Sequence, residues 1–233
     1  MVWRAGFHLV ALMAQYFEVH PLNPQSRLIK QAVEIIRRGG VIAYPTDSSY
    51  AIGCHIGDKD AMERIRRIRR LDDKHNFTLV CADLSQLAQY ARVGNREFRL
   101  LRAHTPGPYT FILPATREVP RRLQHARRKT IGLRVPDHPV VHALLAELGE
   151  PLMSVTLILP ETAPAVRERD AEEAGDLPLA DPREIRARLE HDVDLVIDAG
   201  ASGIEPTTVV VLDEDGGVRV TRVGKGDPAP FQA

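Results

Sequence analysis

The sequence has few cysteines that could cross-link the chain and no long apolar segment that could anchor it in a membrane. Only two cysteines, Cys54 and Cys81, occur among its 233 residues, too few for a disulfide framework and typical of a reducing compartment. No apolar run approaches the roughly 18 residues of a membrane helix, so we expect no membrane partner. The pattern G-x-x-x-x-G-K-[ST] is also absent, which excludes a phosphate site of the P-loop kind. With 44% hydrophobic and 27% charged residues, the composition predicts a folded cytoplasmic protein.

Lysine is scarce, and arginine takes its place. The net charge is zero, so nothing in the total favours nucleic acid or a membrane surface, but only five of the 31 basic residues are lysines. The basic residues gather in two runs, at 64–70 and 121–129. The planar guanidinium fork matches phosphate and carboxylate oxygens, which a lysine ammonium does not. A GC-rich genome produces the same enrichment, so composition alone leaves an anion site and codon bias both open.

Helical and strand-like segments alternate along the chain. Apolar spacing predicts helices at 24–36 (ending at Gly39-Gly40), 59–70 (capped by Asp58), 84–90, 95–103, 139–148 and 182–190. Short apolar or alternating runs predict strands at 41–44, 78–80, 110–113, 130–135, 151–159, 195–197, 208–212 and 218–222. The last two strands are joined by a DEDGG hairpin turn. This pattern predicts a single α/β domain with a mixed sheet flanked by helices; two lobes divided near residue 160 are the alternative.

Two segments are expected to lie outside the packed domain. Residues 1–12 resemble a short signal peptide, but their apolar stretch is shorter than a secretory one, and Met13 precedes a plausible start. We therefore expect an N-terminal extension over 1–12 and one domain over 13–233. Residues 161–181 are polar, rich in proline and without apolar period, which predicts a mobile surface loop.

The segment GGVIAYPTDSSYAIG, residues 39–53, is the most informative one. A buried strand runs into Pro45, so Thr46, Asp47, Ser48 and Ser49 follow at the carboxyl end of a strand, where open α/β sheets bind ligands. These hydroxyls and the carboxylate suit a polar substrate. An ordinary turn stabilised by Asp or Ser side chains explains the same residues.

Basic side chains provide further candidates. Arg69, Lys74 and His75 lie near the start of a strand and suit phosphates, although a solvated face of a basic helix is the simpler interpretation. Arg134 ends a strand and is expected to be half-buried, which requires a carboxylate or phosphate partner. His138 and His142 are spaced for a metal but lack a carboxylate, so we expect an ordinary surface helix and no metal site. The two cysteines are expected to be buried small residues, not nucleophiles.

Four ordered motifs resemble those of the YrdC/YciO family. They read GGVIAYPTDSSYAIG, PGPYTFIL, IGLRVPDHPVVHALLAELGEPL and PTTVVVL followed by VTRVG, and they span residues 24–226. HNFTLVC looks most like the YciO branch. The resemblance implies a twisted sheet with a large, positively charged concave face. It also implies threonylcarbamoyl-AMP synthase chemistry, in which L-threonine, bicarbonate and ATP with Mg²⁺ yield threonylcarbamoyl-AMP and pyrophosphate for modification of tRNA adenosine 37.

The resemblance also assigns roles by position. It implies Arg69 and Lys74 as catalytic cations, Thr46, Ser48, Arg134 and Thr207 on the threonine side, and His75, Thr110, Thr156 and Arg222 on the nucleotide side. No resident metal is implied.

Three positions depart from the family pattern. Leu71 stands where an arginine is expected, Ile158 where an asparagine is expected, and Ala51 where a glycine is expected. Loss of one cation or donor commonly lowers a rate by roughly 10²–10³, so the departures predict a slower synthase, in which Arg70 or Lys74 is a candidate substitute cation. Family members have also been described as binders of double-stranded RNA, so RNA or tRNA binding without efficient catalysis is the alternative function. A nucleotide sensor without turnover is a third.

Overall fold

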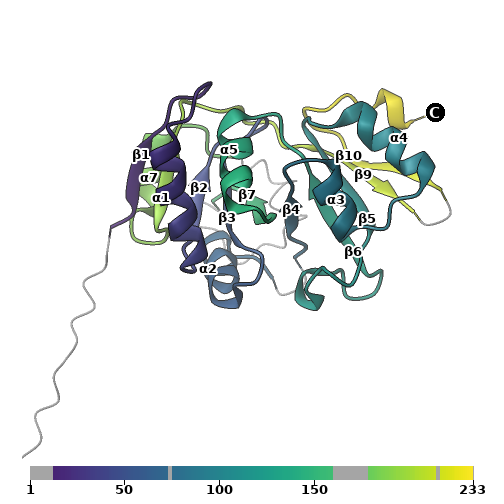
Figure 1. Cartoon of the computed structure of the whole chain (residues 1–233), viewed down its shortest axis with the longest axis horizontal. Coiled ribbons are helices and arrows are strands. Elements are labelled where there is room, and N and C mark those ends of the chain that lie inside the picture. Colours follow the sequence, from purple (N-terminus) through teal and green to yellow (C-terminus); the bar gives the residue numbers. More distant parts are fainter. Residues whose placement is uncertain (1–12, 73–74, 160–177, 214–215, 233) are drawn as a thin grey trace, which may run out of the picture.

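The computed structural model describes residues 13–72, 75–159, 178–213 and 216–232. These residues form one mixed sheet of ten strands in the order β1-β8-β2-β3-β7-β4-β6-β5-β9-β10 (Figure 1). The strands are β1 (Gln15–Glu18), β2 (Ile42–Tyr44), β3 (Ala51–His55), β4 (Thr78–Val80), β5 (Tyr109–Pro114), β6 (Thr130–Arg134), β7 (Leu152–Thr156), β8 (Leu195–Asp198), β9 (Thr208–Leu212) and β10 (Val218–Arg222).

Several neighbouring strands of the sheet are distant in the sequence. β8 lies between β1 and β2 and is parallel to both, and β5 is parallel to β9. β4 and β6 are parallel as well, and the remaining neighbours are antiparallel. Because the sheet runs without interruption through strands from both halves of the chain, the two-lobe alternative is wrong. The expected single α/β domain with a mixed sheet is confirmed.

The α-helices of the described residues mostly begin and end where local chemistry predicts. They are α1 (Ser26–Arg37), α2 (Lys59–Arg69), α3 (Leu84–Tyr90), α4 (Asn95–His104), α5 (Pro139–Leu148) and α7 (Pro182–Leu189). Asp58 caps α2 by accepting a 2.8 Å hydrogen bond from the Ala61 amide, as predicted. Gly149, with a φ of 76°, ends α5 in the left-handed conformation that glycine tolerates best. None of the described helices is long and apolar enough to cross a membrane.

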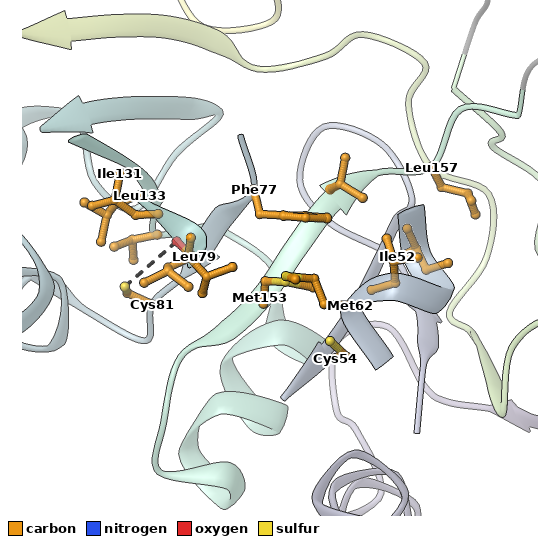
Figure 2. Close-up of a cluster of buried hydrophobic side chains, with 14 of the residues drawn as sticks. Ile52, Cys54, Met62, Phe77, Leu79, Cys81, Ile131, Leu133, Met153 and Leu157 are labelled. Atoms are coloured by element: carbon orange, nitrogen blue, oxygen red, sulfur yellow. Dashed lines mark hydrogen bonds between the residues drawn. The ribbon is translucent and has the colours of Figure 1, made fainter. Parts of the chain in front are cut away.

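Two apolar cores pack the helices against the sheet. Helices α1 and α5 lie side by side and pack against β2, β3, β7 and β8 (Figure 1). A second core joins α2, α3, α4 and α7 to alternate residues of the central strands. Figure 2 shows part of it, with Phe77 lying between Leu133 on one side and Ile52 on the other. The residues that alternate with this second core in the central strands therefore face the opposite side of the sheet.

The structure corrects several sequence-based predictions. β1 and β3 were not predicted, and the strand expected at 151–159 is the shorter β7. The interpretation of the second helix as a solvated face is wrong for Arg66 and Arg69, which are both buried. The extension 1–12, Lys74 and most of the loop 161–181 lie outside the described residues. At the described end of that loop, Leu179 is buried and donates its amide to the Leu157 carbonyl.

Candidate functional site

A cavity of about 360 Å³ lies on the sheet face opposite the second core. Its floor crosses the central strands at residues with small side chains: Ala51 of β3, Ser154 of β7, Thr78 of β4, Gly132 of β6 and Thr110 of β5. Thr78 is paired with both Gly132 and Ser154, so these three residues are direct neighbours across the sheet. The hollow exists because the side chains at this level are too short to fill it. A volume of this size falls within the range of small-molecule sites.

The lining of the cavity is basic. Arg69, Arg134, Arg222 and His75 contribute to it, and none of the described residues that line it is an aspartate or glutamate. Asn76 lines the cavity as well. Guanidinium groups match the oxygens of carboxylates and phosphates, so a lining of this composition favours an anionic ligand.

Arg134 forms the centre of one polar cluster at the cavity. It ends β6, and its side chain is 9% exposed. Its Nη2 donates to the Asp47 carboxylate, to the Ser48 hydroxyl at 3.2 Å and, more weakly, to the Thr46 hydroxyl at 3.5 Å. Its Nε is buried and has no hydrogen-bond partner among the described residues. A buried N–H without a partner is costly, and a ligand oxygen is one way to satisfy it.

The turn after β2 holds the other members of this cluster. Thr46 Oγ1 donates to the Ser49 carbonyl at 2.7 Å and accepts from the Ser48 and Ser49 amides. Thr46 and Ser48 do not line the cavity themselves; they lie behind Arg134. The prediction of a local hydrogen-bonded turn is therefore confirmed, and the role of Thr46 and Ser48 as site residues stays a prediction.

A second polar cluster joins Thr110, Thr207 and Arg222. The hydroxyls of Thr110 and Thr207 are 2.8 Å apart, and Arg222 donates to the Thr207 hydroxyl at 3.2 Å and to its carbonyl at 3.1 Å. The threonine-side role implied for Thr207 stays a prediction, but its contacts are with two residues assigned to the nucleotide side.

Arg69 reaches the cavity from the last turn of α2. Its Nη1 donates to the carbonyl of Ile158, just beyond β7. Of the three departures from the family pattern, Ala51 lies on the cavity floor, whereas Leu71 packs against the second core and Ile158 is buried. Neither Leu71 nor Ile158 lines the cavity. The side chains at positions 71 and 158 therefore contribute neither a cation nor an amide to the cavity.

Arg70, a candidate substitute for the expected cation, does not line the cavity. It adopts a left-handed conformation after α2, with a φ of 50°, and lines a separate groove with Arg64, Arg67 and Arg188. That groove shares no residue with the cavity. Its Arg64 is already paired with Asp194 at 2.8 Å.

Seven of the ten predicted site residues line the cavity: Arg69, His75, Thr110, Arg134, Thr156, Thr207 and Arg222. Thr46 and Ser48 support Arg134 from behind, and Lys74 lies outside the described residues. Sequence analysis missed Ser154, Thr78 and Gly132 on the floor. Their signal is weak, because a serine, a threonine and a glycine within apolar strands look like ordinary strand residues.

The remaining nucleophile and metal candidates have structural explanations. Burial raises the pKa of the Cys54 thiol to about 12 and raises that of Cys81, so both remain protonated and apolar, as expected (Figure 2). His138 caps α5 by accepting from the Val140 amide, and His142 bonds the Pro136 carbonyl. No group of three or more potential metal ligands occurs among the described residues.

The chain is similar to proteins of known sequence and structure. A crystal structure of Escherichia coli YciO, an uncharacterized protein, is 55% identical, with a TM-score of 0.84 over 94% of this chain and all of that one. A threonylcarbamoyl-AMP synthase of Vibrio vulnificus is 33% identical over 131 residues, which are 55% of this chain and 70% of the relative. P. abyssi Sua5 complexed with L-threonine has the same fold, with a TM-score of 0.74 and 21% identity over 90% of this chain and 57% of that one.

The family assignment rests on most of the chain. The family model Sua5_yciO_yrdC, described as telomere recombination, matches residues 34–224, which include both polar clusters of the cavity. Together with the YciO relative, this match shows that the chain belongs to the Sua5/YciO/YrdC family.

Proposed function

We propose that the cavity binds L-threonine and an adenine nucleotide and carries out threonylcarbamoyl-AMP synthase-type chemistry. In this reaction the L-threonine nitrogen bonds to the carbon of bicarbonate, and one oxygen leaves as water, which gives a carbamate. The carbamate oxygen then bonds to the α-phosphorus of ATP while the bond to pyrophosphate breaks. Magnesium enters with ATP as part of the substrate.

The observation that carries the proposal is the buried Arg134, whose Nε has no hydrogen-bond partner among the described residues and which lines the cavity. An arginine with a partnerless, buried Nε needs an oxygen from elsewhere, and the carboxylate of L-threonine has the required charge and shape. The hydroxyls of Thr46 and Ser48 support the same guanidinium. We assign this cluster to the amino acid.

The second cluster suits the nucleotide. Arg222 and the paired hydroxyls of Thr110 and Thr207 offer donors on the other strands that flank the floor, and Arg69 offers a further cation. Carbamate and adenylate formation require positioning and charge stabilisation more than a nucleophilic side chain. The inert thiols agree with such a mechanism.

The comparisons support the class of reaction. The Vibrio relative is a threonylcarbamoyl-AMP synthase, and the Sua5 structure holds L-threonine in the same fold. Leu71 and Ile158 stand where the family pattern has an arginine and an asparagine, so we expect turnover below that of such synthases by roughly 10²-fold or more.

The test is to incubate the protein with ATP, Mg²⁺, bicarbonate and labelled L-threonine and to follow threonylcarbamoyl-AMP and pyrophosphate. Arg69→Ala should abolish product, whereas Arg67→Ala, an exposed arginine of the same helix, should leave it unchanged. A wild-type protein that forms no product and binds neither ligand would refute the proposal. Binding of double-stranded RNA that weakens steeply with salt would then favour the alternative.

A further inference from the structure

Asp47 connects three separate segments beside the cavity. One carboxylate oxygen accepts from Arg134 Nη2, and the other accepts from the Asp137 amide at 3.0 Å. Its backbone carbonyl accepts from the Lys225 ammonium. The Asp47 side chain is only 9% exposed, equal to that of Arg134. The turn after β2, the exit of β6 and the chain after β10 therefore meet at this one residue.

The contacts of Arg134 are unevenly distributed over its guanidinium. All three of its hydrogen bonds to side chains are made through Nη2, and the strongest acceptor among them is the Asp47 carboxylate. Because the guanidinium is planar and rigid, fixing this one nitrogen from the protein side fixes the direction of the other donors. Those donors belong to a residue that lines the cavity.

Stability alone is a weak explanation for this ion pair. Two charges removed from water lose hydration that their attraction only partly restores, so a buried pair contributes little net stability compared with apolar residues of equal size. The pair does, however, keep a long side chain in one orientation. Asp47 also accepts the Asp137 amide, so the carboxylate is itself held from a second direction.

We infer that Asp47 is a positioning residue that orients Arg134 for the carboxylate of the amino-acid ligand. The inference rests on the proposed function in naming that ligand. Asp47 does not contact the ligand; it acts through Arg134. Misplacement of a binding group by about 1 Å can cost up to roughly 10²-fold.

The test compares Asp47→Asn with Asp194→Asn. The control is closely matched, because Asp194 also accepts from an arginine, Arg64, and from a backbone amide, that of Val41 at 2.7 Å. We expect Asp47→Asn to raise the KM for L-threonine roughly ten- to hundredfold while the KM for ATP changes less than about twofold. Asp194→Asn should change neither constant. An equal loss for both substrates, or no loss, would overturn the inference.

A second measurement does not depend on the reaction. The ¹H–¹⁵N signal of the Arg134 Nε–H, identified by its disappearance in Arg134→Lys, should exchange slowly in the wild type and faster in Asp47→Asn. If Asp47→Asn does not fold, Asp47→Glu keeps the charge and should show the same faster exchange. Unchanged exchange in the variant would overturn the inference even if the protein is a synthase. Faster exchange in Asp47→Asn, together with a wild-type protein that binds no L-threonine, would sink only the proposed function.

Discussion

Gly132 offers a direct test of whether ligands lie on the sheet. It is at the centre of the cavity floor, between Thr78 of β4 and Ile112 of β5. A Cβ at this position would be 3.1 Å from the Thr78 hydroxyl oxygen and 3.5 Å from the Thr110 methyl carbon. Gly132→Ala therefore adds one methyl group to the floor, at the cost of a small shift of Thr78.

The substitution should separate stability from binding. Alanine in a strand is favoured over glycine by about 0.5–1 kcal/mol, which offsets the crowding of Thr78, so we expect a stability change within about 1 kcal/mol. For a chain of this length that corresponds to about 2–4 °C in Tm. An added methyl between packed surfaces costs about 1–3 kcal/mol, which predicts ATP binding weaker by roughly fivefold to 150-fold.

The assay is calorimetric titration of ATP into the wild type, Gly132→Ala and Gly217→Ala, together with thermal unfolding. Gly217 lies in the hairpin turn after β9, where the nearest contact of an added Cβ is 3.4 Å, so this variant serves as the control. If Gly132→Ala binds ATP as tightly as the wild type, the nucleotide does not reach the floor and the reasoning fails. If it unfolds, the floor is tighter than its geometry indicates.

Three further predictions concern stability and reactivity. Asp58→Ala removes the cap of α2 and should lower stability by about 1 kcal/mol, or about 2–4 °C in Tm, in thermal unfolding without weakening ATP binding. Burial raises the pKa of Tyr44 to about 12, above its ordinary value of 10.0, so the stability that its neutral form contributes is intact below pH 10.0 and is lost between pH 10.0 and about 12. Urea unfolding should therefore show the free energy of unfolding falling over that pH range, and falling less steeply in Tyr44→Phe. Cys54 and Cys81 should resist a thiol reagent at pH 8 in the folded protein and react in concentrated urea; rapid labelling of the native protein would contradict their burial.

Periodic segments could be predicted from sequence, and fully buried or edge strands could not. α1 and α5 have clear apolar periods and were placed almost correctly. β3 is buried along most of its length, so it has no alternation to detect, and Gly53 within it looks like a turn residue. A side chain at Gly53 would approach the Met153 carbonyl to 2.8 Å, a constraint set by β7 about a hundred residues later. β1 is an edge strand of four residues, and among the described strands it pairs with β8 alone.

Most of the residues that line the cavity were predicted, but their contacts with one another were not. The family resemblance pointed to Arg134 and Arg222, but not to the bond of Asp47 with Arg134 or that of Thr207 with Arg222. The interpretation of α2 as a solvated face was wrong because charged side chains usually face solvent. In the structure Arg66 lies 4.8 Å above the Phe77 ring, and Arg69 bonds the chain beyond β7. Such tertiary contacts lower the cost of burying a guanidinium, and no local pattern reports them.

The parallel pairing of β5 with β9 makes the cavity a late product of folding. Tyr109 pairs with Thr208, so the floor closes only after almost a hundred intervening residues have found their places. Such distant pairings slow folding, because the entropy of closing the long loop is lost before any contact between the two strands forms. A nascent chain that stops short of β9 lacks Thr207 and Arg222 and also leaves one edge of β5 open, ready to pair with another chain. Ligand binding in this fold therefore requires that the chain has been synthesised at least as far as Arg222 of β10.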